Sequence, residues 1–388
     1  MRGRRIARER TGLLAVVVAA LALALGLMSC GGDSGIESGG NGGATETAKS
    51  GPVRGELTVS NWPLYIDTGP NGTVADFEKA TGVSVKYIED VNDNVEFFGK
   101  LRPQLASGSS GGRSMIVLTD WMAGKVHSLG YVQNLDKSAL PNVEKNLRDD
   151  LRHPAIDPNR DYSVPWQTGM TGIIVRRDLA PDIRSVNDLF DPRYAGKVTF
   201  LTEMRDTVPL VMKADGVNPD NATEQDWMDA IDKLKGAVDS SQIRRFTGND
   251  YARDLTKGDV VASIGWSGDA VQLQADNPNI EWRMPTQGCI LWSDNMEIPV
   301  GAPNTAAALA FMNYVYNPEV QANIAAYVNY VTPVKGVQPI LAKRDPALAK
   351  NQLIFPTAQF TKNCSTQPNL TGDEETRVTE AFESLLTG

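Results

Sequence analysis

The apolar residues between position 55 and the C-terminus alternate between strand-like runs and helix-like segments. Residues 56–60 and 115–119 are short apolar runs typical of strands, whereas residues 73–81 and 305–316 have the length and apolar spacing of helices. Because strands that alternate with helices build α/β layers, the sequence predicts an α/β fold. Further strands are predicted at residues 83–88, 171–175, 198–201 and 260–264, and a further helix at residues 223–235.

The C-terminal segment carries one apolar helical face. Val378, Ala381, Phe382 and Leu385 are spaced so that they share one side of a helix. We expect this helix to pack across a lobe. The stretch from residue 55 to residue 388 is long enough for two lobes with substantial cores.

The first 29 residues have the features of an export signal. Five arginines surround the start of the chain, and an apolar run at residues 13–28 ends at Ser29 and Cys30. This run is shorter than the roughly 20 residues of a spanning helix, and a small residue before a lone cysteine suits a lipoprotein signal peptidase. We therefore predict a lipoprotein signal peptide at 1–29 and a lipid on Cys30; the alternative is an uncleaved membrane anchor.

Residues 30–54 follow as a predicted flexible tether. They are mostly Gly, Ser, Thr, Asn and short charged residues, with too little apolar surface to offset the entropy of ordering. Such a tether would hold the folded part clear of a membrane. The expected location is extracytoplasmic, lipid-anchored to the cell membrane, either periplasmic or on the cell surface.

The charge of the chain favours cationic partners. It carries 47 acidic and 38 basic residues, a net charge of −9, and loss of an arginine-rich signal peptide makes the rest more acidic. Such a surface disfavours nucleic acid and attracts cations, although ordinary solubility is an alternative explanation of the charge.

The cysteines and histidines limit the chemistry that the chain can perform. Beyond Cys30 only Cys289 and Cys364 remain, an even pair in an oxidising compartment, so we predict a disulfide between them. His127 and His153 have no metal-ligand spacing and are too few for histidine-based catalysis. We expect no metal, no cofactor and no enzymatic activity.

Aromatic and acidic residues follow several of the predicted strands. Trp62 and Tyr65 come after the first strand, Trp121 after the strand at 115–119, and the pair Glu203 and Asp206 after the strand at 198–201. Ligands of open α/β sheets bind beyond the carboxyl ends of the strands. The pattern therefore predicts a site for a small organic cation, although any single Trp, taken alone, is as well explained by core packing.

Over residues 55–370 the chain resembles the polyamine-binding proteins of ABC transporters, the spermidine/putrescine receptors. The order and spacing of several short segments carry the resemblance. These segments are Ser60-Asn61-Trp62 with Tyr65, Asp161-Tyr162-Ser163-Val164-Pro165, Gly265-Trp266-Ser267-Gly268, Gly288-Cys289-Ile290-Leu291-Trp292-Ser293-Asp294 and Asn329-Tyr330-Val331-Thr332-Pro333.

The resemblance implies a set of ligand-binding residues. The aromatic walls would be Trp62, Tyr65, Trp121, Trp266, Trp292 and Tyr330, the ammonium-binding carboxylates Glu203, Asp206 and Asp294, and the polar neighbours Thr119 and Gln367. The family has Asp and then Glu after the corresponding strand, whereas here Glu203 precedes Asp206. This exchange keeps the charge but shifts its reach by a methylene group.

The chemistry of a polyamine agrees with these residue types. Its ammonium groups have pKa values near that of lysine and need buried counter-charges, and its methylene groups need flat apolar walls. Tryptophan and tyrosine faces supply these walls and add cation–π attraction of about 0.5 to 2 kcal/mol. Three carboxylates match the three charges of spermidine, and Trp266 resembles the spermidine-preferring members, so spermidine is favoured over putrescine.

The resemblance also implies a two-lobed periplasmic-binding-protein fold of type II with hinge crossover strands. Lobe 1 would comprise 55–165 and 294–332, and lobe 2 would comprise 166–293 and 333–388. We place the crossings near Pro165, residues 292–295 and Thr332. Hinge closure would present a composite surface to the permease subunits of an ABC transporter, and we expect a monomer. The disulfide, three residues before both Trp292 and Gln367, would pin the C-terminal segment to the site.

Other functions fit part of this pattern. A carbohydrate or other small-solute receptor also uses carboxylates and aromatic residues, and a glycosidase would use Glu203 and Asp206 as acid and base. A neutral sugar fits these segments poorly. They offer few amide and arginine donors to its hydroxyl groups, and it gains little from three nearby negative charges. A polyamine sensor without a transport role is indistinguishable by sequence.

Overall fold

The computed structural model describes residues 46–368, 370 and 372–387. The predicted signal peptide at 1–29, the lipidated Cys30 and most of the predicted tether lie outside the described residues. Residues 45–388 form a unit of their own. No helix among the described residues is long and apolar enough to cross a membrane.

The strands divide between a large mixed sheet and one small pair. They are β1 (Thr47–Ala48), β2 (Glu56–Asn61), β3 (Ser84–Glu89), β4 (Met115–Thr119), β5 (Asn134–Leu135), β6 (Val164–Arg176), β7 (Val198–Leu201), β8 (Ile243–Thr247), β9 (Ala262–Trp266), β10 (Ile280–Arg283), β11 (Ile290–Glu297) and β12 (Ser365–Thr366).

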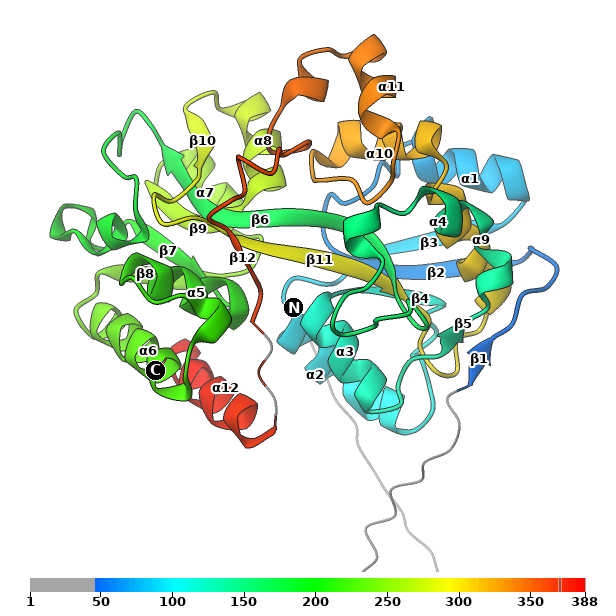
Figure 1. Cartoon of the computed structure of the whole chain (residues 1–388), viewed down its shortest axis with the longest axis horizontal. Helices are drawn as coiled ribbons and strands as arrows, with labels where there is room; N and C mark the ends of the chain where they lie inside the picture. The colour runs from blue at the N-terminus through cyan, green and yellow to red at the C-terminus, as the bar shows by residue number, and fades with distance from the viewer. Residues whose placement is uncertain (1–45, 369, 371, 388) are drawn as a thin grey trace, which may run out of the picture. The chain divides into compact units, whose positions relative to one another are not determined.

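Helices cover both ends of the large sheet (Figure 1). They are α1 (Thr73–Thr81), α2 (Asn94–Ala106), α3 (Asp120–Ser128), α4 (Pro141–Asn146), α5 (Met204–Ala214), α6 (Glu224–Asp239), α7 (Tyr251–Lys257), α8 (Ser267–Asp276), α9 (Thr305–Val315), α10 (Pro318–Val328), α11 (Val337–Arg344) and α12 (Gly372–Leu386). The predicted α/β alternation is therefore present.

Strands β6 and β11 join the two ends of the large sheet. Its order is β3-β2-β4-β11-β6-β9-β7-β8, with β10 paired to β6 and β12 paired to β11. The antiparallel β6 and β11 run side by side across the middle of Figure 1, between the strands β2 to β4 and the strands β7 to β9. The outer pairs β2–β3, β2–β4, β7–β8 and β7–β9 are parallel. The carboxyl ends of β4 and β9 thus lie beside the middle of the central pair, where Thr119 pairs with Asp294 and Trp266 with Thr171.

The three predicted crossing points lie on neighbouring segments. Pro165 is in β6, the register of β11 shifts between Asp294 and Asn295, and a β-bridge joins Thr168 to Val331, next to Thr332. The lobe boundaries drawn through these points remain a prediction.

One part of the predicted tether is ordered. Thr47 and Ala48 form β1, which pairs in parallel with β5, and Ala48 is completely buried. The prediction of a flexible tether over 30–54 is therefore wrong at its C-terminal end, because the backbone there pairs with β5 and the Ala48 side chain is part of the core. Any tether has to end before Thr47.

Local chemistry fixes most of the element boundaries. The helix predicted from residue 223 begins at Glu224, because Thr223 is its N-cap and exchanges hydrogen bonds with Asp226. The strands predicted at 83–88 and 260–264 lie at Ser84–Glu89 and Ala262–Trp266. The predicted apolar face of the C-terminal helix is present in α12, where Val378, Phe382 and Leu385 are buried.

Candidate functional site

A cavity opens where β2, β4, β7 and β9 end, beside the middle of β11. The empty space around its lining residues, including the part that is open to solvent, amounts to about 380 Å³. It is lined by Trp62, Pro63, Tyr65, Thr119, Glu203, Asp206, Asn249, Trp266, Asp269, Trp292, Asp294, Tyr330 and Gln367. Every binding residue expected from the sequence, except Trp121, lines this cavity.

Trp121 does not line this cavity, and its ring contacts an arginine of the protein. The guanidinium carbon of Arg205 stands 4.0 Å from the centre of its ring, and Arg205 also forms an ion pair of 3.0 Å with Glu375 in α12. Both Trp121 and Arg205 are buried. The role of Trp121 in the cation site therefore stays a prediction, because a cation of the protein itself covers one face of its ring, whereas the ring also borders a second cavity with Trp292 and Gln367.

Asp294 in β11 is held by two hydroxyl groups. Tyr65 donates a hydrogen bond of 2.9 Å to Oδ2, and Thr119 donates one of 2.8 Å to Oδ1. Burial raises the pKa of the Asp294 carboxyl to about 7, against the lowering effect of these two donors. Asp294 is therefore a buried acid that loses its proton readily once a cation lies beside it.

Glu203 is oriented by the start of α2. The backbone N–H of Asn94 donates a bond of 2.7 Å to Oε1, and the Asn94 side-chain amide donates one of 2.8 Å to the same oxygen. That amide also donates to Thr119 Oγ1 at 2.9 Å, which connects Glu203 to the partners of Asp294. Burial, and then the charge of Asp93, hold the pKa of Glu203 well above its usual range.

Asp206 lies in the first turn of α5. The indole N–H of Trp266 donates a bond of 3.0 Å to Oδ2, and the side-chain amide of Gln367 donates one of 2.9 Å to Oδ1. Burial raises the pKa of Asp206. Asp206 thus connects the predicted wall residue Trp266 to the predicted polar neighbour Gln367, which come from distant parts of the chain.

Asp269 is a fourth cavity carboxylate, which the sequence analysis missed. It accepts hydrogen bonds from the hydroxyls of Tyr330 and Tyr251, each of 2.6 Å, and one of 3.0 Å from the Asn249 amide. Burial raises its pKa as well. Its position three residues after Trp266, in the first turn of a helix that follows a strand, is the signal that could have identified it.

Among the described residues, the four carboxylates form no ion pair, although the buried Arg205 guanidinium attracts Glu203 from a longer distance. No arginine or lysine contributes to the pKa of Asp206, Asp269 or Asp294, and none forms an ion pair with Glu203. No group of three acidic, histidine or cysteine side chains in this part of the chain lies close enough to hold a metal ion. Buried carboxylates that are spread around one cavity fit a larger cation that carries several separated charges.

Aromatic rings supply the apolar walls between these carboxylates. The ring centres of Trp62 and Trp266 are 5.8 Å apart, those of Tyr65 and Tyr330 are 5.2 Å apart, and those of Trp292 and Tyr330 are 5.5 Å apart. All five of these side chains are at least nine-tenths buried. Such walls bind methylene groups and attract cations through their ring faces.

Two glycines make room for the rings. A Cβ atom at Gly169 would lie 2.3 Å from the ring of Trp292, and one at Gly268 would lie 2.4 Å from the ring of Tyr330. Real Cβ atoms do not approach other carbons so closely. These glycines therefore permit the close packing that shapes the cavity.

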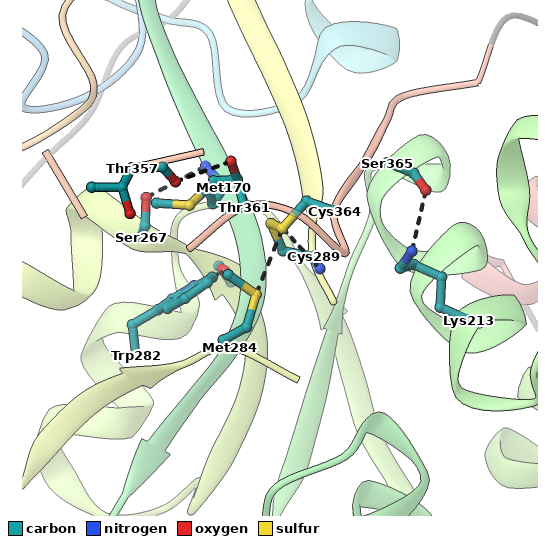
Figure 2. The surroundings of a disulfide bond; sticks show 11 residues. Met170, Lys213, Ser267, Trp282, Met284, Cys289, Thr357, Thr361, Cys364 and Ser365 are labelled. Atoms are coloured by element: carbon teal, nitrogen blue, oxygen red, sulfur yellow. Dashed lines mark hydrogen bonds between the residues drawn. A yellow bond between two sulfur atoms is a disulfide. The ribbon is translucent and has the colours of Figure 1, made fainter. Parts of the chain in front are cut away.

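The predicted disulfide between Cys289 and Cys364 is confirmed (Figure 2). The bond lies beside Met284 and Trp282, and it joins the start of β11 to the segment that enters β12. This segment then brings Gln367 to the cavity. The disulfide and the hydrogen bond to Asp206 together hold Gln367, a residue from the C-terminal part of the chain, at the cavity.

A family model described as a bacterial extracellular solute-binding protein matches residues 72–352. The chain is similar to the spermidine/putrescine-binding periplasmic protein of Escherichia coli, with 29% identity over 337 residues that span 86% of this chain and 92% of the relative. It is also similar to the putrescine-binding periplasmic protein PotF of Escherichia coli, with 30% identity over 329 residues that span 78% and 83%.

A solved structure has the same arrangement of elements. It is the spermidine/putrescine ABC transporter substrate-binding protein PotD of Streptococcus pneumoniae, with a TM-score of 0.69 at 22% identity, covering 86% of this chain and 98% of that chain. At this identity the likeness concerns the fold. It confirms the predicted fold class.

Proposed function

The chain belongs to the family of bacterial extracellular solute-binding proteins, and we propose that it binds a polyamine outside the cytoplasm and delivers it to an ABC permease. Its Escherichia coli relatives carry names that describe spermidine and putrescine binding. Proteins of this family are receptors and not enzymes.

One observation carries the proposal most directly. Glu203, Asp206, Asp269 and Asp294 surround a single cavity, are buried in it and form no ion pair in the described part of the chain. Leaving such groups ionised and unpaired is costly, so the cavity favours a ligand that brings positive charges. The aromatic walls between the carboxylates suit the methylene groups that separate the charges of a polyamine.

Spermidine is the favoured ligand. Asp269 accepts three hydrogen bonds from the protein, more than any other cavity carboxylate, so it mainly orients Tyr330 and Tyr251. Glu203, Asp206 and Asp294 remain for ammonium groups, and their number equals the three charges of spermidine. Putrescine, with two charges, would leave one buried carboxylate uncompensated.

We infer that the cavity lies between two lobes that close on the ligand. The predicted lobe 1, at 55–165 and 294–332, contributes Trp62, Tyr65, Thr119, Asp294 and Tyr330. The predicted lobe 2, at 166–293 and 333–388, contributes Glu203, Asp206, Trp266, Trp292 and Gln367. A ligand that contacts both sets stabilises the closed arrangement, because it binds that arrangement more tightly than an open one.

Isothermal titration tests the binding function. A form that begins at Gly31 contains every described residue, and it is refolded to remove any ligand carried through purification. We expect tight binding of spermidine, weaker binding of putrescine and no heat from a neutral disaccharide. Asp206→Asn should weaken spermidine binding at least thirty-fold, whereas Asp239→Asn, which removes an exposed carboxylate paired with Lys235, is the matched control.

Two outcomes of this titration would favour the alternatives. Heat from the disaccharide alone would favour a carbohydrate receptor, and silence with every amine would refute polyamine binding. A polyamine sensor without a transport role would bind spermidine equally well. Uptake of labelled spermidine into cells with and without the protein separates sensing from transport.

We also propose that a lipid on Cys30 holds the monomeric receptor at the outer face of the cell membrane. The apolar run before Ser29 and Cys30 supports this location. Labelling of cells with a radioactive fatty acid should mark the protein, and Cys30→Ala should remove the label. A labelled Cys30→Ala variant would refute this anchor.

A further inference from the structure

The disulfide lies at the base of two segments that both reach the ligand cavity. Cys289 immediately precedes β11, which carries Trp292 and Asp294 into the cavity. Cys364 immediately precedes β12, and Gln367 immediately follows it. The sulfur–sulfur bond therefore ties the start of one site-bearing segment to the start of the other.

Besides the disulfide, a short ladder and a few hydrogen bonds hold β12 in register. Its ladder with β11 has only two residue pairs, Ile290 with Ser365 and Leu291 with Thr366. The Lys213 ammonium donates a hydrogen bond of 3.1 Å to the Ser365 hydroxyl (Figure 2). A pairing this short is marginal without further support. The covalent bond supplies that support one residue before the ladder begins.

The register of β12 decides where Gln367 lies. Its backbone N–H donates a hydrogen bond of 3.1 Å to the carbonyl of Leu291, and its side-chain nitrogen donates one of 2.9 Å to Asp206. Its side-chain oxygen Oε1 is buried and has no hydrogen-bond partner among the described residues. Because the nitrogen is turned toward Asp206, the oxygen is the remaining atom that can accept a bond from a ligand ammonium group.

We propose that the Cys289–Cys364 disulfide is a positioning device for the binding site, which holds Gln367 so that its amide orients Asp206 and offers Oε1 to the ligand. This inference rests on the proposed polyamine function. Opening the bond with an external dithiol transfers two electrons and two protons, which yields two cysteine thiols and oxidises the dithiol. Gln367 then loses its fixed register, and the affinity for the ligand falls.

A bond that only stabilises the fold would behave differently. Closing a loop between residues 75 positions apart restrains the unfolded chain whatever the segment does at the site. In that case the thermal midpoint falls when the bond is removed, but Gln367 contributes equally to ligand affinity with and without the bond. The contribution of Gln367 is therefore the quantity that distinguishes positioning from global stabilisation.

A double-mutant cycle measures this contribution. Spermidine affinity is determined by titration, well below the thermal midpoint, for four proteins: the parent, Gln367→Ala, the double variant Cys289→Ala with Cys364→Ala, and the triple variant. A hydrogen bond to a charged group corresponds to roughly ten- to hundredfold in affinity. We expect Gln367→Ala to cost at least about tenfold in the parent and less than about threefold once the disulfide is absent.

Equal costs in both backgrounds, or full spermidine affinity without the disulfide, would overturn the proposal. If the double cysteine variant does not fold, the folded parent is opened with dithiothreitol and titrated instead. The proposed function fails separately, when the parent itself binds no polyamine.

In that case hydrogen exchange tests the disulfide without a ligand. Removal of the disulfide should reduce the protection of the Gln367 backbone amide at least tenfold, and unchanged protection would refute the positioning role.

Discussion

Replacing Asp294 by asparagine removes a charge from the cavity while keeping the size of the side chain. Asp294 is 4% exposed, accepts hydrogen bonds from Tyr65 and Thr119, and has no basic partner in the described structure. A ligand ammonium group would therefore be its counter-charge. Loss of one member of such a desolvated pair costs roughly 2 to 5 kcal/mol, which is about thirty-fold to a few thousand-fold in affinity.

The pKa of Asp294, raised to about 7 by burial, adds a pH dependence to this loss. Part of the unliganded molecules therefore carry a neutral Asp294 at pH 7, and binding of a cation has to ionise it. Each pH unit below 7 adds up to about 1.4 kcal/mol, or tenfold in affinity. The ratio of the two affinities, parent over Asp294→Asn, should therefore be largest at pH 8 and shrink as the pH falls to 5.

Titration calorimetry with spermidine at pH 8, 7, 6 and 5 measures this ratio. The other three cavity carboxylates remain in both proteins, so the ratio isolates Asp294. A ratio below threefold at pH 8, or one that stays constant with pH, would refute the reasoning.

The same raised pKa affects the unliganded protein. A carboxyl group whose pKa is raised by folding contributes stability below its unfolded pKa, and this contribution is lost as the pH rises through the folded value. Asp294→Asn should therefore raise the thermal midpoint without ligand at pH 8. At this pH the folded parent carries a buried negative charge, which costs free energy, and the asparagine variant does not. Equal midpoints at pH 8 would contradict this account of the burial cost.

Three further substitutions test other parts of the structure. Gly268→Ala places a methyl group 2.4 Å from the ring of Tyr330, so a lower thermal midpoint and weaker spermidine binding are expected, and an unchanged affinity would show that the ring moves freely. Arg205→Met removes the cation from the face of Trp121 and should lower the free energy of unfolding by about 1 to 3 kcal/mol in urea titration, against the outcome of no change if the contact contributes nothing. Glu297→Gln should raise the thermal midpoint more at pH 8 than at pH 5, since burial holds the Glu297 pKa well above its usual range and both its oxygens lack partners in the described structure; a larger gain at pH 5 would reverse the assignment.

Local sequence patterns determined much of the fold and of the site. The strands at Met115–Thr119 and Val198–Leu201 and the helix at Thr73–Thr81 lie at the predicted positions, because apolar periodicity and caps act over a few neighbouring residues. Trp62, Tyr65, Glu203 and Asp206 were predicted because they follow strands, and the carboxyl ends of parallel strands converge in space. The other predicted binding residues, such as Trp292 and Tyr330, were expected from the family resemblance. The disulfide followed from the number of cysteines and the compartment.

The tertiary structure decided the features that depend on distant neighbours. Trp121 follows a strand as the other wall residues do, yet Arg205 from another part of the chain covers its ring. Asp269 became a cavity residue because Tyr330, from the end of α10, lies beside it. The order of the strands around β6 and β11, and the two-residue pairing that places Gln367, join segments far apart in sequence. Sequence spacing predicts which residues share a strand end or a helix face, whereas only the folded chain determines which distant side chain fills the space opposite them.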